Sequence, residues 1–216
     1  MPCCCADVGV AAERQFGEKR AAKDLAQYRS NGPASTTRLL LAGLATAGPL
    51  HGRLLDIGSG VGALSFELLD RGLTSAMGVD LSSAHIATAS QEASRRRRSD
   101  STRFVQGDFL DVAGELPSAD VVTLDRVVCC YPEYERLLEE SLRHADRIFA
   151  FSYPRDLWYV RVWAGLQNLG RAIVRNAFRS FIHPVSAMEN VIRREGFTLL
   201  DRRSTHTWRA DVYVRP

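Results

Sequence analysis

Residues 53–62, Arg-Leu-Leu-Asp-Ile-Gly-Ser-Gly-Val-Gly, constrain the fold of this chain more than any other stretch. The apolar run at 53–57 predicts a short buried strand. The three glycines after it predict a tight turn, because glycine accepts positive φ angles and leaves the main chain bare. The apolar spacing at 63–71 predicts a helix. A strand, a glycine turn and a helix start favour a site for a nucleotide-like ligand, since the first N–H groups of a helix are unpaired; the alternative is a glycine turn that binds nothing.

The spacing of the glycines separates two kinds of site. Dinucleotide-binding proteins have Gly-x-Gly-x-x-Gly, whereas this chain has Gly-x-Gly-x-Gly with Asp56 two residues before the first glycine. This pattern resembles motif I of the class I S-adenosylmethionine (SAM)-dependent methyltransferases, in which two hydrophobic residues precede Asp-hydrophobic-Gly-x-Gly-x-Gly. The resemblance covers roughly residues 53–153 and implies that the cofactor is SAM.

Strands and helices alternate after this motif. Apolar runs predict further strands near 75–79, 103–106, 119–124 and 147–153, with helices at 83–97 and 133–144 between them. Helical crossovers of this length indicate a parallel sheet. The last two runs, 197–202 and 208–214, predict a hairpin. We therefore expect an α/β fold: a Rossmann-like, seven-stranded, mainly parallel sheet with helices on both faces and a C-terminal antiparallel hairpin.

The chain is expected to divide into two parts. Residues 1–50 contain two predicted helices, at 11–29 and from about Ala34, with a break at Ser30-Asn31-Gly32-Pro33. These helices either cover the cofactor as a flap or pack at the edge of the sheet. Residues 51–216 form the methyltransferase domain, with a helical cap on the acceptor side at about 155–182.

Polar residues recur where the predicted strands end, and ligands bind beyond the carboxyl ends of strands in such sheets. The resemblance implies that Asp80 accepts both ribose hydroxyls and that Asp108 accepts from the adenine amino group, with Phe109 and Leu81 against the ring. Each acid taken singly could also be a solvated carboxylate. The predicted cofactor-binding residues are Asp56, Gly58, Ser59, Gly60, Gly62, Asp80, Leu81, Asp108, Phe109 and Asp125.

The reaction that the resemblance implies is direct methyl transfer from the sulfonium, which needs alignment and exclusion of water. A general base is required only if the acceptor is protonated. The catalytic candidates are Arg126, Tyr131 and His183. His183 has the most suitable resting pKa, but a histidine before proline at a helix start is more often a cap or a core residue. No metal is expected, because 153–156 lacks the Asp-Asn pair of metal-dependent catechol-type enzymes.

Residues 155–182 carry most of the information about the acceptor. Their tryptophans suggest a flat or apolar small molecule, and their arginines suggest a carboxylate or phosphate on it. The layout distantly resembles the magnesium-protoporphyrin O-methyltransferases. Residues 125–128, Asp-Arg-Val-Val, lack the Asn/Asp-Pro-Pro-aromatic stretch of enzymes that methylate amino groups. The alternatives are an RNA-modifying enzyme that uses the run Arg95–Arg98, and a SAM-binding protein without transferase activity.

Composition also bears on whether the protein binds nucleic acid, spans a membrane, is secreted or contains disulfides. The net charge of +3 is too small to imply a nucleic-acid partner by itself, and no apolar run approaches the roughly 18 residues of a membrane span. The N-terminus lacks the pattern of a signal peptide, so we expect a cytoplasmic protein. The cysteines at 3–5 and 129–130 are odd in number and adjacent, which predicts reduced thiols instead of disulfides or a metal site.

Overall fold

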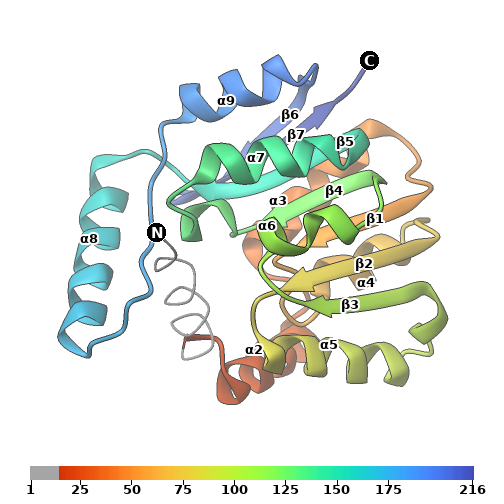
Figure 1. The fold of residues 1–216 in the computed structure, drawn as a ribbon, viewed down its shortest axis with the longest axis horizontal. Helices are drawn as coiled ribbons and strands as arrows, with labels where there is room; N and C mark the ends of the chain where they lie inside the picture. Colours follow the sequence, from red (N-terminus) through yellow and green to blue (C-terminus); the bar gives the residue numbers. More distant parts are fainter. Residues whose placement is uncertain (1–14) are drawn as a thin grey trace.

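The computed structural model describes residues 15–216, and a seven-stranded sheet runs through its centre (Figure 1). The strand order is β3-β2-β1-β4-β5-β7-β6. All pairs from β3 to β5 are parallel, whereas β7 pairs antiparallel with both β5 and β6. The strands are β1 (Arg53–Ile57), β2 (Ser75–Asp80), β3 (Thr102–Gln106), β4 (Ala119–Asp125), β5 (Ala145–Pro154), β6 (Thr198–Ser204) and β7 (Trp208–Val214). The predicted α/β class and its antiparallel C-terminal hairpin are confirmed.

Helices cover both faces of the sheet. They are α2 (Glu18–Asn31), α3 (Ser35–Leu44), α4 (Ala63–Leu69), α5 (Ser83–Arg95), α6 (Phe109–Val112), α7 (Tyr134–Arg143), α8 (Trp158–Ile173) and α9 (Val185–Arg194). One buried cluster joins the sheet to α6, α7 and α9, and a second joins the opposite face to α3 and α4. Among these described helices, none is both long and apolar enough to cross a membrane.

The order of the strands brings three carboxyl ends together. Strand β1 pairs with β2 on one side and with β4 on the other, so Ile57 stands opposite both Val79 and Leu124. The residues that follow these positions, Gly58, Asp80 and Asp125, therefore leave the sheet side by side. This is where the chain reverses the direction in which strands are added, and ligands in open α/β sheets bind at that point.

Several boundaries differ from the prediction for local reasons. Helix α2 begins at Glu18 and continues to Asn31, because the chain turns only at Gly32, whose φ of 73° ends the helix. Residues 11–14 of the predicted helix and the cysteines at 3–5 lie outside the described residues. The short helix α6 was not predicted; it starts where Asp108 caps it by accepting a hydrogen bond from the Leu110 N–H (3.0 Å).

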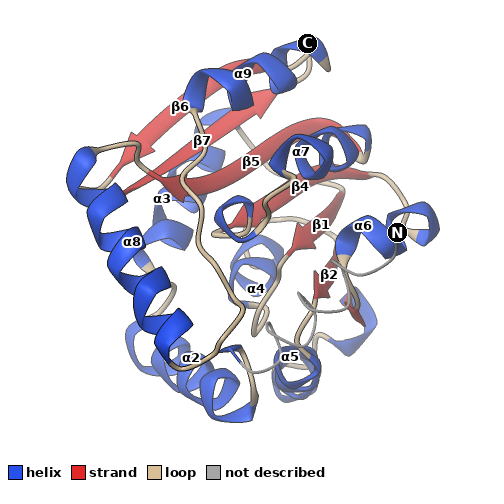
Figure 2. Ribbon diagram, turned by 60° about the vertical axis from the view of Figure 1, so that its left-hand side comes forward, coloured by secondary structure: helices blue, strands red, loops and turns tan. Residues whose placement is uncertain are grey.

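Helix α8 stands apart from the layers (Figures 1 and 2). It leaves the end of β5, and residues 174–184 then run back along it without regular structure to α9. The predicted cap at 155–182 therefore consists of one helix and one extended return segment.

Candidate functional site

The glycine loop at 58–62 joins β1 to α4 through left-handed backbone at Gly58, Gly60 and Gly62, with φ angles of 68°, 54° and 78°. The N–H groups of Gly58 and Ser59 donate to the Val79 carbonyl at 2.7 and 3.0 Å, which ties the loop to β2. A Cβ on Gly58 would collide with Val127, whereas a Cβ on Gly60 would meet nothing nearer than His85 Cδ2 at 3.8 Å. Gly58 thus serves packing, and Gly60 presents bare main chain to open space.

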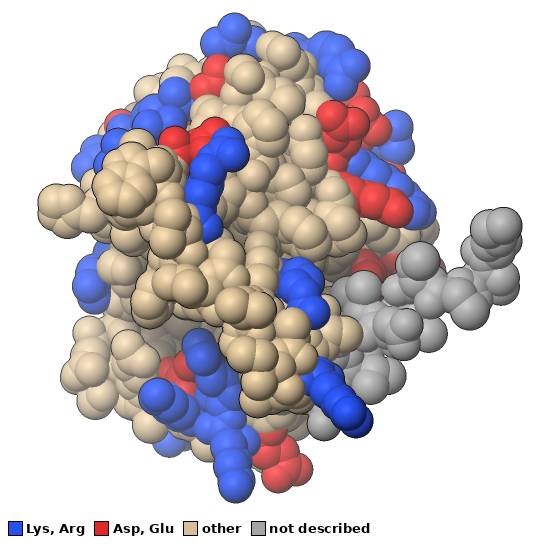
Figure 3. Space-filling model, turned by 90° about the vertical axis from the view of Figure 1, so that its left-hand side faces the viewer, with Lys and Arg blue, Asp and Glu red and all other residues tan. Residues whose placement is uncertain are grey.

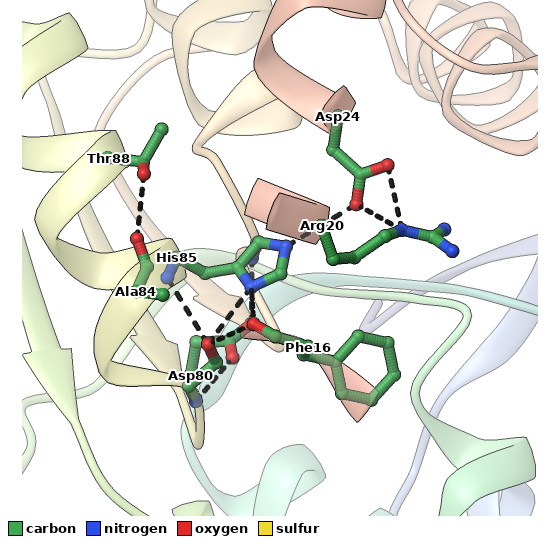
Figure 4. A network of polar contacts seen from close by, with 9 residues as sticks. Phe16, Arg20, Asp24, Asp80, Ala84, His85 and Thr88 are labelled. Atoms are coloured by element: carbon green, nitrogen blue, oxygen red, sulfur yellow. Dashed lines mark hydrogen bonds and ion pairs between the residues drawn. The ribbon is translucent and has the colours of Figure 1, made fainter. Parts of the chain in front are cut away.

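Asp80, at the end of β2, joins this loop to the start of α5 (Figure 4). Its Oδ2 accepts from the Gly60 N–H at 2.8 Å, and its Oδ1 accepts from the Ser82 N–H at 2.9 Å. The side chain is partly exposed. A carboxylate oxygen has more than one acceptor position, so Asp80 can hold the loop and still accept hydrogen bonds from a ligand.

Asp56 lies beneath the loop and is almost fully buried. Its oxygens accept from the hydroxyls of Ser65 (2.7 Å) and Thr123 (2.8 Å), which fixes β1 against α4 and β4. Burial, together with the nearby carboxylates of Asp125 and Asp80, raises the pKa of Asp56 to about 7 in spite of these hydrogen bonds. The three carboxylates are thus close enough to repel one another.

Asp125, at the end of β4, connects three elements. It accepts from the hydroxyls of Thr37 in α3 (2.5 Å) and Ser152 in β5 (2.6 Å). The Ser152 hydroxyl in turn accepts from the Arg126 N–H at 2.9 Å. Arg126 has a φ of 64°, so the chain turns sharply directly after Asp125.

Asp108 and Tyr131 form a pair beside the α6 start. The Tyr131 hydroxyl donates to Asp108 at 2.9 Å, and burial together with this carboxylate raises the pKa of Tyr131. Phe109 is buried in the core, where its ring packs edge-on against His144 with 5.7 Å between ring centres. Tyr131 therefore keeps its proton at neutral pH and acts as a hydrogen-bond donor to Asp108.

His183 contacts the main chain and an aromatic ring. Its Nε2 lies 3.1 Å from the Val128 carbonyl, and its ring centre lies 4.2 Å from that of Tyr134. Burial lowers the pKa of His183, so the neutral ring is favoured.

A cavity of about 710 Å³ brings most of the predicted residues together. It extends from the glycine loop to the inner side of α8, and its size is typical of sites for small molecules, roughly 300–1,000 Å³. The predicted site residues that line it are Asp56, Gly58, Ser59, Gly60, Asp80, Leu81, Phe109, Asp125, Arg126 and Tyr131. Gly62, Asp108 and His183 are not among the lining residues.

The lining also includes residues that the sequence did not single out, above all Phe16 and His85 (Figure 4). The Phe16 carbonyl accepts from the Ser82 hydroxyl at 2.6 Å and lies 3.0 Å from His85 Nδ1. The Phe16 ring packs edge-on against His85 and Phe178, with 6.0 and 5.3 Å between ring centres. A lone aromatic residue before Gly17 was the available signal, but nothing local says that it spans from α5 to the cap.

The cap end of the cavity combines aromatic rings with a guanidinium group. Tyr159 and Trp163 of α8 line it together with Phe178 and Arg171. Arg171 Nη1 donates to the Ser180 hydroxyl at 3.1 Å, and its guanidinium lies 5.2 Å from the centre of the Phe178 ring. These contacts hold a positive charge at the cavity wall next to a flat apolar surface.

Residues 55–147 match a family model described as a methyltransferase domain. The whole chain superposes on the magnesium protoporphyrin IX methyltransferase of Synechocystis PCC 6803 with bound SAM, at 17% identity and a TM-score of 0.71, covering 100% of both chains. An O-methyltransferase family protein from Burkholderia thailandensis matches at 17% identity and a TM-score of 0.72, over 94% of this chain and 62% of that one. A search of curated protein sequences finds no significant match. At these identities the structural likeness establishes the fold.

Proposed function

We propose that this chain, a class I SAM-dependent methyltransferase with a methyltransferase domain at residues 55–147, methylates a small molecule with a flat or apolar body and an anionic group. The observation that carries the proposal is the single cavity: the glycine loop and Asp80 line one end, and aromatic rings with Arg171 line the other. Donor and acceptor would thus meet inside one cavity.

The residues at the strand ends suit SAM by charge and by shape. SAM carries a sulfonium and an ammonium group, and the three neighbouring carboxylates of Asp56, Asp80 and Asp125 favour a cation there. Gly60 leaves room at its α-carbon for a ligand to lie against the main chain. In our proposal Asp80 accepts from the ribose hydroxyls, while Asp56 acts on the loop through Ser65 and Thr123.

The residues proposed to surround the adenine are Leu81, Phe109, Asp108 and Tyr131, and only some of them face the cavity. Leu81 and Phe109 line the cavity, but Phe109 is almost fully buried and packs against His144, so little of its ring is open to a base. Asp108 lies behind the lining with Tyr131 as its partner. We propose that Asp108 positions Tyr131 and the start of α6 around the adenine.

Methyl transfer at this site would depend on alignment. When bound, SAM supplies an electrophilic methyl group on a sulfonium that leaves as a neutral thioether. The protein's own part is to orient the acceptor and exclude water, and the aromatic rings of Phe16 and Trp163 line the cavity where this would occur. Tyr131 stays protonated and His183 lies outside the lining. We therefore propose that the nucleophile is already ionised, as a carboxylate is at neutral pH, and that Arg126 or Arg171 orients it.

The alternative acceptor, RNA, is disfavoured by the ion pairs of Arg95–Arg98. Arg95 and Arg96 both donate to buried Glu92 at 2.7–2.8 Å, and Arg98 donates to Asp70 at 2.7 Å. Binding phosphates with these groups would take Arg95 and Arg96 away from buried Glu92 and leave it with Arg29 alone, which is unfavourable.

We propose different roles for the two parts of the chain. Residues 1–50 contribute a flap: α2 lines the cavity with Asp24 and Tyr28, and Arg29 ties α2 to Glu92 of α5. Residues 51–216 hold the catalytic domain, with the cap at 155–182 enclosing the acceptor. We place this activity in the cytoplasm.

The test is methyl incorporation from radiolabelled SAM. The purified protein is incubated with planar aromatic carboxylates, with their amides, and with total RNA. We expect label in the carboxylates alone, and an Arg171→Gln variant should raise their KM about tenfold while Arg175→Gln, at an exposed arginine, changes nothing. Label in RNA alone would refute the small-molecule assignment. SAM binding without methyl transfer to the carboxylates, the amides or the RNA would support the alternative of a SAM-binding protein without transferase activity.

A further inference from the structure

Helix α8 turns its apolar side outward. Large apolar residues along it are strongly exposed: Trp158 77%, Val162 55%, Trp163 62%, Leu166 57%, Leu169 59% and Ile173 75%. Val160 is the single α8 residue that is fully buried. A helix of a globular protein normally presents its apolar stripe to the core, so this helix is inverted.

The inversion follows from the helix geometry. At 100° per residue, positions 158, 162, 166, 169 and 173 fall on one side, with 159 and 163 next to them. No charged or polar side chain other than the Tyr159 hydroxyl interrupts this outer face. The opposite side carries Gln167 and Arg171, which line the cavity. The polar side of α8 therefore faces the cavity, and its apolar side faces outward without a partner among the described residues.

The charged residues of the segment 155–182 are mostly positive, although Arg171 lies on the cavity side of α8. Residues 155–182 contain five arginines and a single acid, Asp156, which binds Arg161. Arg175, directly after the helix, is exposed. Figure 3 views this side of the molecule: a broad area without charged side chains has lysine or arginine at several of its edges, with aspartate or glutamate at others.

We propose that the outer face of α8 docks on an anionic lipid bilayer. The helix has 16 residues, about 24 Å at 1.5 Å per residue, which is too short to span the roughly 30 Å core of a bilayer but suits a helix lying in the interface. Amphipathic helices that bind membranes in this way combine an apolar face containing Trp and Leu with flanking arginines. A protein partner would not require the flanking arginines.

Docking of α8 would also bring one end of the cavity to the membrane surface. Tyr159 and Trp163 belong both to the outer face and to the cavity lining. With α8 seated, the cap end of the cavity opens at the lipid surface. This inference concerns membrane binding and stands whether or not the acceptor is the one proposed above.

The experiment is sedimentation of the full chain with vesicles of phosphatidylcholine alone or mixed with phosphatidylglycerol. We expect the protein to pellet with the anionic vesicles, with a blue shift of tryptophan emission because Trp158 and Trp163 leave water. The double variant Leu166→Asp/Leu169→Asp should bind these vesicles at least about tenfold more weakly. Leu199→Asp/Leu200→Asp, at apolar residues of β6 exposed 42% and 41%, should bind as the wild type does.

Circular dichroism of each variant establishes that it is folded. Failure of the wild-type protein to bind, equal binding to both vesicle types, or undiminished binding by the α8 variant would overturn the proposal. Sedimentation velocity without lipid tests whether a second copy of the chain covers this face instead. A dimeric wild type together with a monomeric α8 variant would assign the face to that second copy. SAM affinity, measured in parallel, should be unchanged by either double variant.

Discussion

Replacing Asp80 tests the cofactor site most directly. The carboxylate holds the Gly60 and Ser82 N–H groups at 2.8 and 2.9 Å, and in the proposed complex it also accepts from two ribose hydroxyls. Hydrogen bonds to a charged group contribute about 1.5–3 kcal/mol each. Losing two of them from a partly exposed side chain should cost about 3–4 kcal/mol, or roughly 100- to 1,000-fold in Kd.

Titration calorimetry with S-adenosylhomocysteine measures this loss without turnover. Asp80→Ala should show the full loss, and Asp80→Asn, which keeps an acceptor oxygen but removes the charge, about a tenfold loss. Asp146→Ala serves as the control, because Asp146 is an exposed acid near the start of β5, at the other end of the sheet. If Asp80→Ala binds within about threefold of the wild type and thermal unfolding shows it intact, the ribose assignment is wrong.

Three further predictions concern the loop, the buried acid and the flap. Gly60→Val and Gly48→Val should each lose about 1–2 kcal/mol of stability, since both glycines have positive φ, but only Gly60→Val should lose SAM binding in calorimetry. The pKa of Asp56 is raised to about 7, so its protonated form stabilises the fold below pH 4, and this stabilisation, about 4 kcal/mol, is lost as the pH rises through 7. In urea unfolding at pH 5 and pH 8, the free energy of unfolding of Asp56→Asn should therefore change less with pH than that of the wild type. An equal change in both proteins would contradict the burial argument. Glu92→Ala should release α2, lowering the free energy of unfolding by about 1–3 kcal/mol and speeding hydrogen exchange in α2; protection equal to that of the wild type would refute the tether.

The sequence predicts the frame of the site well because strand ends are local signals. Glycines and acids after short apolar runs locate Gly58, Asp80 and Asp125, and the parallel sheet then places them side by side. The hydroxyl partners were missed for a physical reason. Thr37 and Ser152 bind Asp125 across 88 and 27 residues of chain, and no periodicity reports a contact between elements that are distant in sequence.

Helix α8 shows a second limit. Its apolar spacing indicates a helix, and the structure has one at Trp158–Ile173. Periodicity gives the width of an apolar stripe but not the side of the helix that meets the protein. The polar side of α8 faces the cavity because Arg171 is held by Ser180 and Phe178 on the return segment, a contact that only the folded chain reveals.

Phe16 has a consequence for the order of events during turnover. Its ring packs against His85 beside the glycine loop and against Phe178 beside the cap, so one side chain contributes to the wall at both ends of the cavity. A displacement of Phe16 would therefore change the cavity wall at both ends at once. If Phe16 moves during turnover, release of the spent cofactor and of the methylated product would be coupled, and the frequency of that movement would set an upper bound on kcat.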